Sequence, residues 1–198
     1  MTRKEAENKL KKIFGFDRFY DTQWDAIEKM FQGKRILLIE KTGFGKSLCY
    51  QFPATQLEGT AVIFSPLIAL MRDQVKKLNS LGLSAKCINS NQTEEENTQI
   101  IKEAKENQIK ILYIAPERME NYEWLETSRQ LKLSMVVMDE AHCISVWGHD
   151  FRPSFKRIIS LVQLLPSNFP VLATTATATK RVEKDIVGQM GGNTISIR

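Results

Sequence analysis

Short apolar runs alternate along the chain with longer amphipathic stretches. Runs such as RILLIE and SMVVMD have the length and continuous apolar character of buried strands rather than of helices. Strands of this kind, separated by helices, predict a mostly parallel sheet that is covered by helices on both faces and joined by right-handed crossovers. The predicted strands are residues 35–40, 61–64, 84–88, 111–115, 134–139, 170–174 and 194–197.

Helices are indicated between these runs by spacing and by capping signals. Thr2 with Glu5 and Thr93 with Glu96 form the TxxE pattern of a capping box, in which each threonine precedes a helix. A further helix face is predicted from apolar residues that recur every three to four positions, namely Leu67, Leu70, Met71, Val75 and Leu78. Of these, we expect Leu70, Met71 and Val75 to form core.

Composition places the chain among globular proteins of one domain. It has 198 residues, 42% hydrophobic and 26% charged, and it contains no repeat, low-complexity stretch or Pro/Gly-rich linker, so residues 1–198 are predicted to form a single domain. No apolar run approaches the roughly 18 to 20 residues that span a bilayer. The charged N-terminus lacks the apolar region of a secretion signal, which predicts a cytoplasmic protein.

The cysteines bear on disulfides and metal sites, and the charge distribution bears on the kind of binding partner. Cys49, Cys87 and Cys143 are odd in number and far apart, so we expect no disulfide framework and no zinc site, and three small neutral residues instead. The net charge is +5, and residues 151–198 alone supply seven Lys or Arg against Glu183 and Asp185. This basic end suits a polyanionic partner, although a solvated lysine-rich surface has the same composition.

A glycine-rich segment, EKTGFGKS at residues 40–47, follows the first predicted strand and precedes a helix. Glycines at positions 43 and 45 allow the backbone to approach phosphate oxygens closely, Lys46 is placed to contact the β and γ phosphates, and Ser47 offers a hydroxyl to Mg²⁺. Glu40 stands where the full P-loop pattern has its first glycine, and a plain strand-to-helix turn with an incidental lysine remains the alternative. The predicted phosphate-binding residues are Thr42, Gly43, Phe44, Gly45, Lys46 and Ser47.

An acidic pair, Asp139 and Glu140, ends the apolar strand SMVVMD, at the edge where open parallel sheets bind ligands. Asp139 is suited to hold Mg²⁺ through water, and Glu140 is suited to polarise the water that attacks the γ phosphate. An acidic pair also commonly begins a helix. A P-loop followed after about 90 residues by such a strand nevertheless predicts nucleotide hydrolysis, with Lys46, Asp139 and Glu140 as catalytic residues.

The order of motifs resembles the first RecA-like motor domain of RecQ-family DNA helicases, which belong to superfamily 2. The resemblance covers nearly the whole chain. The segments that carry it are FGFDRFYDTQ, GFGKSLCYQ, SPLIALMRDQV, YIAPERM, DEAHCIS, TTATAT and, as the most diagnostic, CISVWGHDFRPSF.

This resemblance implies a three-layer RecA-like P-loop fold and an ATP-dependent helicase that moves 3′ to 5′ on single-stranded DNA, with ATP and Mg²⁺ as cofactors. It also implies that Gln23 reads adenine while Phe16 stacks on it. The family usually has an arginine at Tyr20 and a glutamine at Val146. A second RecA-like domain supplies an arginine in such motors, so we expect this chain, as a fragment, to hydrolyse ATP poorly by itself. The zinc-binding region of the family is not expected in these residues.

The segment CISVWGHDFRPSF, residues 143–155, follows the acidic pair and alternates aromatic with polar residues. We call it the aromatic segment. Aromatic faces stack on unpaired bases, and arginine adds phosphate or cation–π contacts. The alternative is that Trp147, Phe151 and Phe155 are core anchors. The resemblance implies that Trp147, His149, Phe151 and Arg152 couple single-strand binding to ATP hydrolysis.

Three further strand ends carry candidate residues. By analogy with the family, Ser65 and Leu67 meet the DNA backbone, and Arg118 either contacts phosphate or pairs with Glu117. The hydroxyls of Thr175 and Thr177 either connect His142 to the far wall of the cleft or serve only as turn chemistry.

Two other classes of protein remain as alternatives. A P-loop kinase or transport ATPase shares the phosphate loop but not the aromatic segment or SPLIALMRDQV. A non-catalytic RecA-like binding module shares the fold but does not require Lys46, Asp139 and Glu140.

Overall fold

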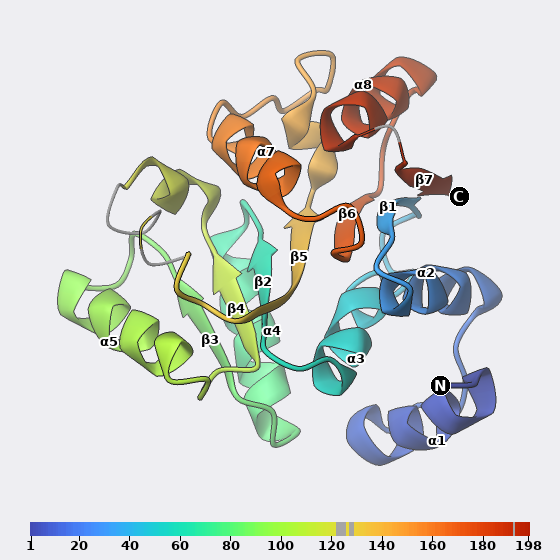
Figure 1. Cartoon of the computed structure of the whole chain (residues 1–198), viewed down its shortest axis with the longest axis horizontal. Coiled ribbons are helices and arrows are strands. Elements are labelled where there is room, and N and C mark those ends of the chain that lie inside the picture. The colour runs from blue at the N-terminus through green and yellow to red at the C-terminus, as the bar shows by residue number, and fades with distance from the viewer. Residues whose placement is uncertain (122–125, 127–128, 192) are drawn as a thin grey trace.

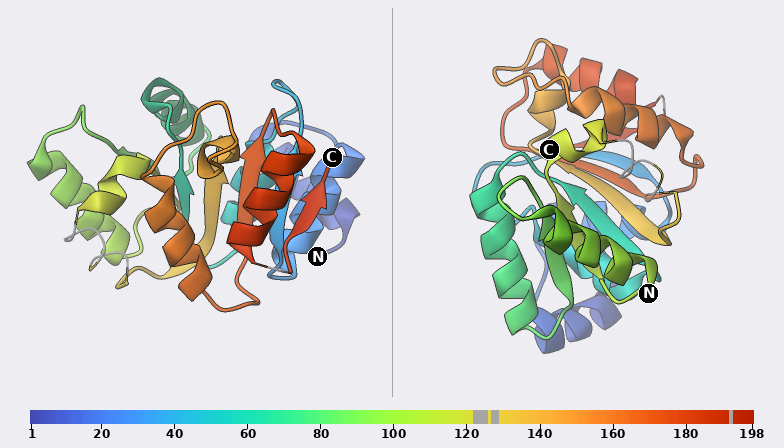
Figure 2. Two further views of the ribbon diagram at one scale, coloured as in Figure 1. Left: turned by 90° about the horizontal axis from the view of Figure 1, so that it is seen from above. Right: turned by 90° about the vertical axis from the view of Figure 1, so that its left-hand side faces the viewer.

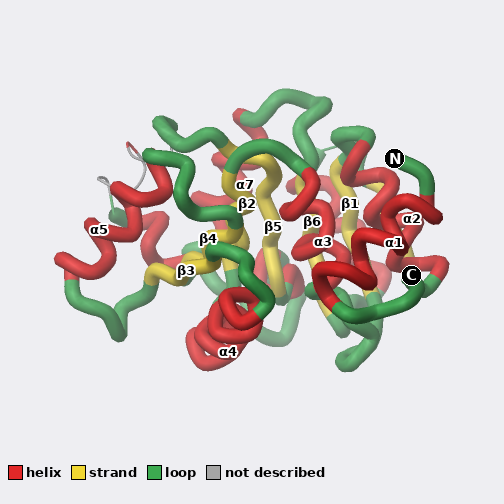
Figure 3. Tube along the Cα trace, turned by 90° about the horizontal axis from the view of Figure 1, so that it is seen from below, coloured by secondary structure: helices red, strands yellow, loops and turns green. Residues whose placement is uncertain are grey.

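The computed structural model describes residues 1–121, 126, 129–191 and 193–198, and its centre is a seven-stranded sheet (Figure 1). The paired strands are parallel, in the order β3-β4-β2-β5-β6-β1-β7. Figure 3 shows this order from β3 beside α5 to β1 beside α2. The strands are β1 (Arg35–Ile39), β2 (Thr60–Phe64), β3 (Ala85–Ile88), β4 (Ile111–Ile114), β5 (Leu133–Asp139), β6 (Val171–Thr175) and β7 (Ile195–Ile197), which confirms all seven predicted strands.

Helices cover both faces of the sheet, as Figure 2 shows from two sides. Neighbouring strand residues point to opposite faces, so Leu37 packs with one helix layer and Leu38 with the other. The first layer contains α5 (Glu94–Lys105), α7 (Phe155–Leu164) and α8 (Lys180–Met190). The second contains α1 (Arg3–Phe14), α2 (Asp21–Phe31), α3 (Leu48–Gln56) and α4 (Ile68–Ser80). The predicted three-layer α/β fold is confirmed.

Local signals account for several helix boundaries. Thr2 and Thr93 both form complete capping boxes, with Glu5 and Glu96 as partners. Of the residues expected to form core, Met71 is buried and Val75 packs against the core, but Leu70 is 39% exposed. That expectation was wrong for Leu70 because α4 buries a narrow stripe, and Leu70 lies beside it and lines a cavity instead.

Parallel strands bring all of their carboxyl ends to one edge of the sheet. The phosphate loop follows β1, Ser65 follows β2, and the short helix η1 (Pro116–Glu120) follows β4. The acidic pair ends β5, where the short helix η2 (Ala141–Ile144) begins. Residues distant in sequence therefore share this carboxyl edge. Within the described residues, no helix is both long and apolar enough to cross a bilayer.

Candidate active site

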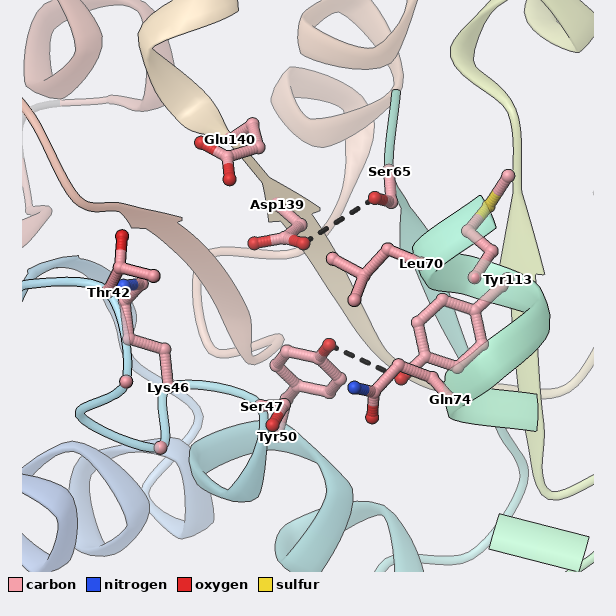
Figure 4. A pocket seen from close by; sticks show the side chains of 13 residues that line it. Thr42, Lys46, Ser47, Tyr50, Ser65, Leu70, Gln74, Tyr113, Asp139 and Glu140 are labelled. Atoms are coloured by element: carbon pink, nitrogen blue, oxygen red, sulfur yellow. Dashed lines mark hydrogen bonds between the residues drawn. The ribbon is translucent and has the colours of Figure 1, made fainter. Parts of the chain in front are cut away.

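A cavity of about 300 Å³ opens at the carboxyl edge between the phosphate loop and the acidic pair (Figure 4). Lys46 and Ser47 line one side of the cavity, and Asp139 and Glu140 line the other. The prediction that the glycine-lined loop and the acidic pair share one cleft is confirmed. Ser65 and Leu70 complete the wall toward α4.

The phosphate loop has the backbone that its glycines predict. Gly43 and Gly45 adopt φ values of 84° and 88°, in the left-handed region that favours glycine. A Cβ at position 45 would lie 2.8 Å from the side-chain nitrogen of Gln23. Glu40, in contrast, is not among the described residues with positive φ, and its N–H donates to the carbonyl of Thr175 at 3.1 Å. The position where the P-loop pattern has its first glycine thus accommodates a glutamate without strain.

Lys46 is folded back over its own loop. Its ammonium donates to the carbonyl oxygens of Glu40 and Lys41, at 2.7 and 3.0 Å. Phosphate oxygens are stronger acceptors than neutral carbonyls, since charge-assisted hydrogen bonds are roughly twice as strong. The lysine is therefore placed to exchange these contacts for a polyphosphate.

Asp139 is oriented by two neighbouring strands. The Thr174 hydroxyl at the end of β6 donates to one carboxylate oxygen at 2.7 Å, and the Ser65 hydroxyl donates to the other at 3.5 Å. Ser65 was predicted for another role, and Thr174 was not predicted as a site residue. With the Ser47 hydroxyl across the cavity, the carboxylate forms the hard oxygen donor set that Mg²⁺ prefers, so these residues fit that ion.

Glu140 has an unusual backbone and an unusual acidity. Its φ and ψ of 55° and 46° are left-handed, a conformation that costs a non-glycine residue roughly 1–2 kcal/mol. Burial, together with the negative charge of Asp139, raises the pKa of Glu140 above its ordinary value of 4.5. Strain and a raised pKa at one residue in a cleft are typical of a functional carboxylate.

His142 connects the acidic pair to β6. Its Nδ1 lies 3.1 Å from the Thr175 hydroxyl and 3.3 Å from a Glu140 carboxylate oxygen. Burial, assisted by the nearby His149, lowers the pKa of His142, which disfavours an ion pair with Glu140. The predicted connection through Thr175 is present. Thr177 joins it through its backbone N–H and carbonyl, however, and not through the hydroxyl that we expected.

A second cavity of about 300 Å³ adjoins the outer side of the phosphate loop. Phe16, 49% exposed, lines it, and Tyr20 packs on Phe44 with ring centroids 5.5 Å apart. Gln23 is only 4% exposed: its amide oxygen accepts from the Tyr20 N–H, and its amide nitrogen donates to the carbonyls of Phe44 and Gly45. Gln23 thus ties the segment before α2 to the phosphate loop, a contact that sequence reasoning missed.

The aromatic segment after η2 is held against α8. The Arg181 guanidinium lies 3.2 Å from the centroid of the Trp147 ring, and the Ser145 hydroxyl donates to Asp185 at 2.5 Å. His149 stacks on His142 with ring centroids 4.3 Å apart, so the segment touches the acidic pair through that histidine. Sequence spacing gave no sign of the contacts with α8.

The aromatic residues of this segment differ in burial, which tests the alternative that they are core anchors. Phe155 is fully buried and is a core anchor, whereas Trp147 is 55% exposed and is not. Phe151 is partly buried, with Lys156 above its ring. Arg152 pairs with Asp150 at 3.2 Å and with Glu117 at 3.8 Å.

Arg118, at the end of β4, was expected to contact phosphate or to pair with Glu117. Among the described residues it pairs with Glu94 at the start of α5, at 2.9 Å, rather than with Glu117, and the contact with phosphate stays a prediction. Glu94 is 24 residues away in sequence, so local spacing pointed to the wrong partner.

The cysteines have the neutral character expected of them. Burial raises the pKa of Cys49 and of Cys143 to about 12, and that of Cys87 above its ordinary value. Among the described residues, one group has the composition of a metal site: ligand atoms of His142, Cys143 and Asp150 lie within 4.8 Å of one another.

Comparisons with known proteins agree with this geometry. The DEAD/DEAH box helicase family matches residues 20–186. The chain is 41% identical over 186 residues to the ATP-dependent DNA helicase RecQ of Bacillus subtilis, covering 93% of this chain and 32% of that protein. It is 39% identical over 178 residues to the RecQ of Haemophilus influenzae, with 90% and 29% covered. The chain therefore spans about a third of the length of these relatives.

Solved structures share the fold. The helicase MrfA bound to DNA superposes with a TM-score of 0.75 at 22% identity, over 97% of this chain and 29% of that one. The Hef helicase domain of Pyrococcus furiosus superposes with a TM-score of 0.69 at 19% identity, over 89% and 37%. The family match excludes the kinase and transport ATPase alternative. With its phosphate loop and acidic pair in one cleft, the chain belongs to the DEAD/DEAH box helicase family.

Proposed function

We propose that the chain is the ATP-binding motor domain of a RecQ-like 3′–5′ DNA helicase, which couples ATP hydrolysis to movement on single-stranded DNA and to duplex unwinding. The observation that carries this proposal is the shared cavity of Lys46, Ser47, Asp139 and Glu140. The similarity to RecQ helicases over about nine-tenths of the chain supports the choice of DNA as the substrate.

In this proposal each side of the cavity has a separate task. Lys46 leaves the carbonyls of its own loop and binds the β and γ phosphates. Ser47 and Asp139 would hold Mg²⁺, which would supply positive charge to the phosphates. Glu140 orients the attacking water and accepts its proton. Because its pKa is raised, Glu140 is a stronger base than an exposed carboxylate.

The aromatic segment is the proposed link to DNA. Trp147, His149, Phe151 and Arg152 contact unpaired bases and backbone phosphates, and Ser65 and Arg118 contact the backbone at neighbouring strand ends. The stack of His149 on His142 supports this assignment, because His142 contacts both Glu140 and Thr175. Movement of the segment on DNA binding is thereby transmitted to the proposed base.

The adenine assignments require a rearrangement. Phe16 lines the second cavity and is exposed for stacking. Gln23 must exchange its contacts with Phe44 and Gly45 for the base, and this exchange would link adenine binding to the phosphate loop.

We further propose that a second RecA-like domain supplies the arginine that stabilises the transferring phosphoryl group. Such an arginine contributes roughly 10³ to 10⁵ in rate in other nucleotide hydrolases. The test compares DNA-stimulated phosphate release by these 198 residues with release by a protein extended through a second motor domain. We expect slow release and no unwinding by the 198 residues alone, and equal rates would refute the need for a second domain.

A further inference from the structure

The cavity that contains Ser47 and Asp139 is also lined by a pair of buried tyrosines that have no role in the proposed reaction. Tyr50 comes from the first turn of α3, directly after the phosphate loop, and Tyr113 comes from β4. Their hydroxyl oxygens are 3.3 Å apart, and both rings line the cavity that contains Asp139 (Figure 4). The two residues are only 2% and 1% exposed.

Two glutamines hold this pair in place. The side-chain nitrogen of Gln51 donates to the Tyr113 hydroxyl oxygen at 2.9 Å and to the side-chain oxygen of Gln74 at 2.7 Å. Both N–H groups of Gln51 are thereby used. Gln74 belongs to α4, so the network ties together α3, α4 and β4.

A count of protons shows that this network has one donor left over. The Tyr113 oxygen already accepts a hydrogen bond from Gln51, and one proton lies between the two tyrosine oxygens. Whichever tyrosine provides that proton, the proton of the other must be donated elsewhere. Within the described residues neither hydroxyl has a further partner, and buried donors are rarely left unpaired.

The surroundings keep that proton on the tyrosines, and the cavity beside them contains an acceptor. Burial raises the pKa of Tyr113 to about 12 and that of Tyr50 well above 10, and the negative charge of Asp139 contributes at both. Both hydroxyls are therefore neutral donors at neutral pH. The acceptor-rich part of their surroundings is the cavity itself, where the Asp139 carboxylate lies.

We propose that the Tyr50–Tyr113 pair is an outer-shell donor of the magnesium site and positions a metal-bound water beside Asp139. The inference rests on the proposed function and extends it by two positioning residues. Outer-shell partners of metal ligands typically contribute 10- to 100-fold in metal affinity. The pair also connects α3 and β4, so it fixes the distance between the phosphate loop and the strand in which YIAPERM begins.

The test measures binding of a fluorescent non-hydrolysable ATP analogue to the 198-residue chain as Mg²⁺ is titrated. Replacing both tyrosines by phenylalanine keeps the rings and removes both hydroxyls. We expect the Mg²⁺ concentration for half-maximal binding to rise about tenfold, while binding in EDTA is unchanged. Each single variant, Tyr50→Phe or Tyr113→Phe, retains one free proton and should change this concentration less than threefold.

A matched control separates positioning from stability. Thr60→Val removes another buried hydroxyl, which donates to the Ile109 carbonyl at the opposite edge of the sheet. It should lower the melting temperature without changing the Mg²⁺ dependence. A purely structural role for the tyrosines would weaken binding equally with Mg²⁺ and with EDTA, and that result would overturn the inference.

The outcomes distinguish the inference from the proposed function. Mg²⁺-dependent binding that is the same in the wild type and in the double variant would overturn the inference and leave the proposed function standing. No nucleotide binding by the wild type would overturn both. Should the double variant not fold, ¹⁹F NMR of the fluorotyrosine-labelled wild type decides: Mg²⁺ added to bound nucleotide must shift the Tyr50 and Tyr113 signals, and unshifted signals would overturn the inference.

Discussion

At the carboxyl edge of the sheet the phosphate loop and the acidic pair face one cavity, whereas at the amino edge a charged side chain at the start of β1 binds the ends of two helices. At the amino edge, the Arg35 guanidinium donates to the carbonyls of Met190, Val162 and Leu165 at the ends of α8 and α7. A Cβ at Gly33 would lie 2.0 Å from the carbonyl oxygen of Asn168.

At the carboxyl edge the polar groups keep spare capacity. Among the described residues, Lys46 donates to two carbonyls of its own loop, Glu140 holds a strained backbone with a raised pKa, and one tyrosine proton lacks a partner. The same parallel sheet therefore has an amino edge where Arg35 joins two helix ends and a carboxyl edge where a strained carboxylate and a lysine face a cavity. Unpaired buried atoms do not distinguish the edges, since Arg35 Nε, Ser134 Oγ and Thr194 Oγ1 at the amino edge also lack a partner among the described residues. Substitutions at the two edges should affect different measurements.

The largest effect is expected for Glu140→Gln, which removes the proposed base but keeps size and hydrogen bonding. In a protein that includes a second motor domain, DNA-stimulated phosphate release should fall by roughly 10²- to 10⁴-fold. The melting temperature should stay within about 2 °C, because a surface-cavity isostere leaves packing intact. Glu106→Gln, an exposed change at the other edge, is the control. Unaltered hydrolysis by Glu140→Gln would favour a non-catalytic binding module.

At the amino edge, Gly33→Ala should destabilise the fold by roughly 3 kcal/mol or more, because its Cβ collides with backbone that cannot move aside and the backbone is left-handed. Gly82→Ala is the matched control: its φ is similar, at 80° against 70°, but a Cβ there meets no atom within 4 Å. The control should cost only about 1 kcal/mol. Urea denaturation measures both, and equal losses would contradict the role assigned to the Asn168 contact.

Arg35→Met should cost about 2 kcal/mol, since it leaves the carbonyls at the ends of α7 and α8 without their charged donor. Arg35→Lys keeps the charge but loses the fork that reaches three oxygens, and should recover only part of that loss. Nucleotide affinity at 25 °C should match the wild type in both variants. A large change in nucleotide affinity with little change in the free energy of unfolding would show that the amino edge also affects ligand binding.

The smallest expected effect is a shift in pH dependence. Glu140 acts as a base only when ionised, so hydrolysis should be lost as the pH falls through its folded pKa. Because that pKa is raised, the acidic limb of the rate profile should lie above pH 4.5. A limb at or below that pH would show that Glu140 is not the group that titrates.

Much of the architecture was predictable from the sequence because strand formation depends on short continuous apolar runs. All seven strands, both capping boxes and the pairing of the phosphate loop with the acidic pair followed from local patterns. In a parallel sheet, residues that end different strands meet at one edge, so motifs alone predicted one cleft. Leu70 was misplaced because helical spacing does not give the width of the buried stripe.

Partner choice was decided by tertiary packing. Arg118 pairs with Glu94, Trp147 with Arg181, and Asp139 with Thr174, and each partner lies on another element.

Amino-acid order alone determined which elements form and which residue types reach the ligand edge, because both depend on neighbours along the chain. The packed sheet decided which of those polar groups are satisfied and which keep a free proton. Tyr50 and Tyr113 are far apart in sequence, and a hydrogen bond between them forms only when their oxygens are placed to within a few tenths of an ångström. Only the folded chain sets that placement.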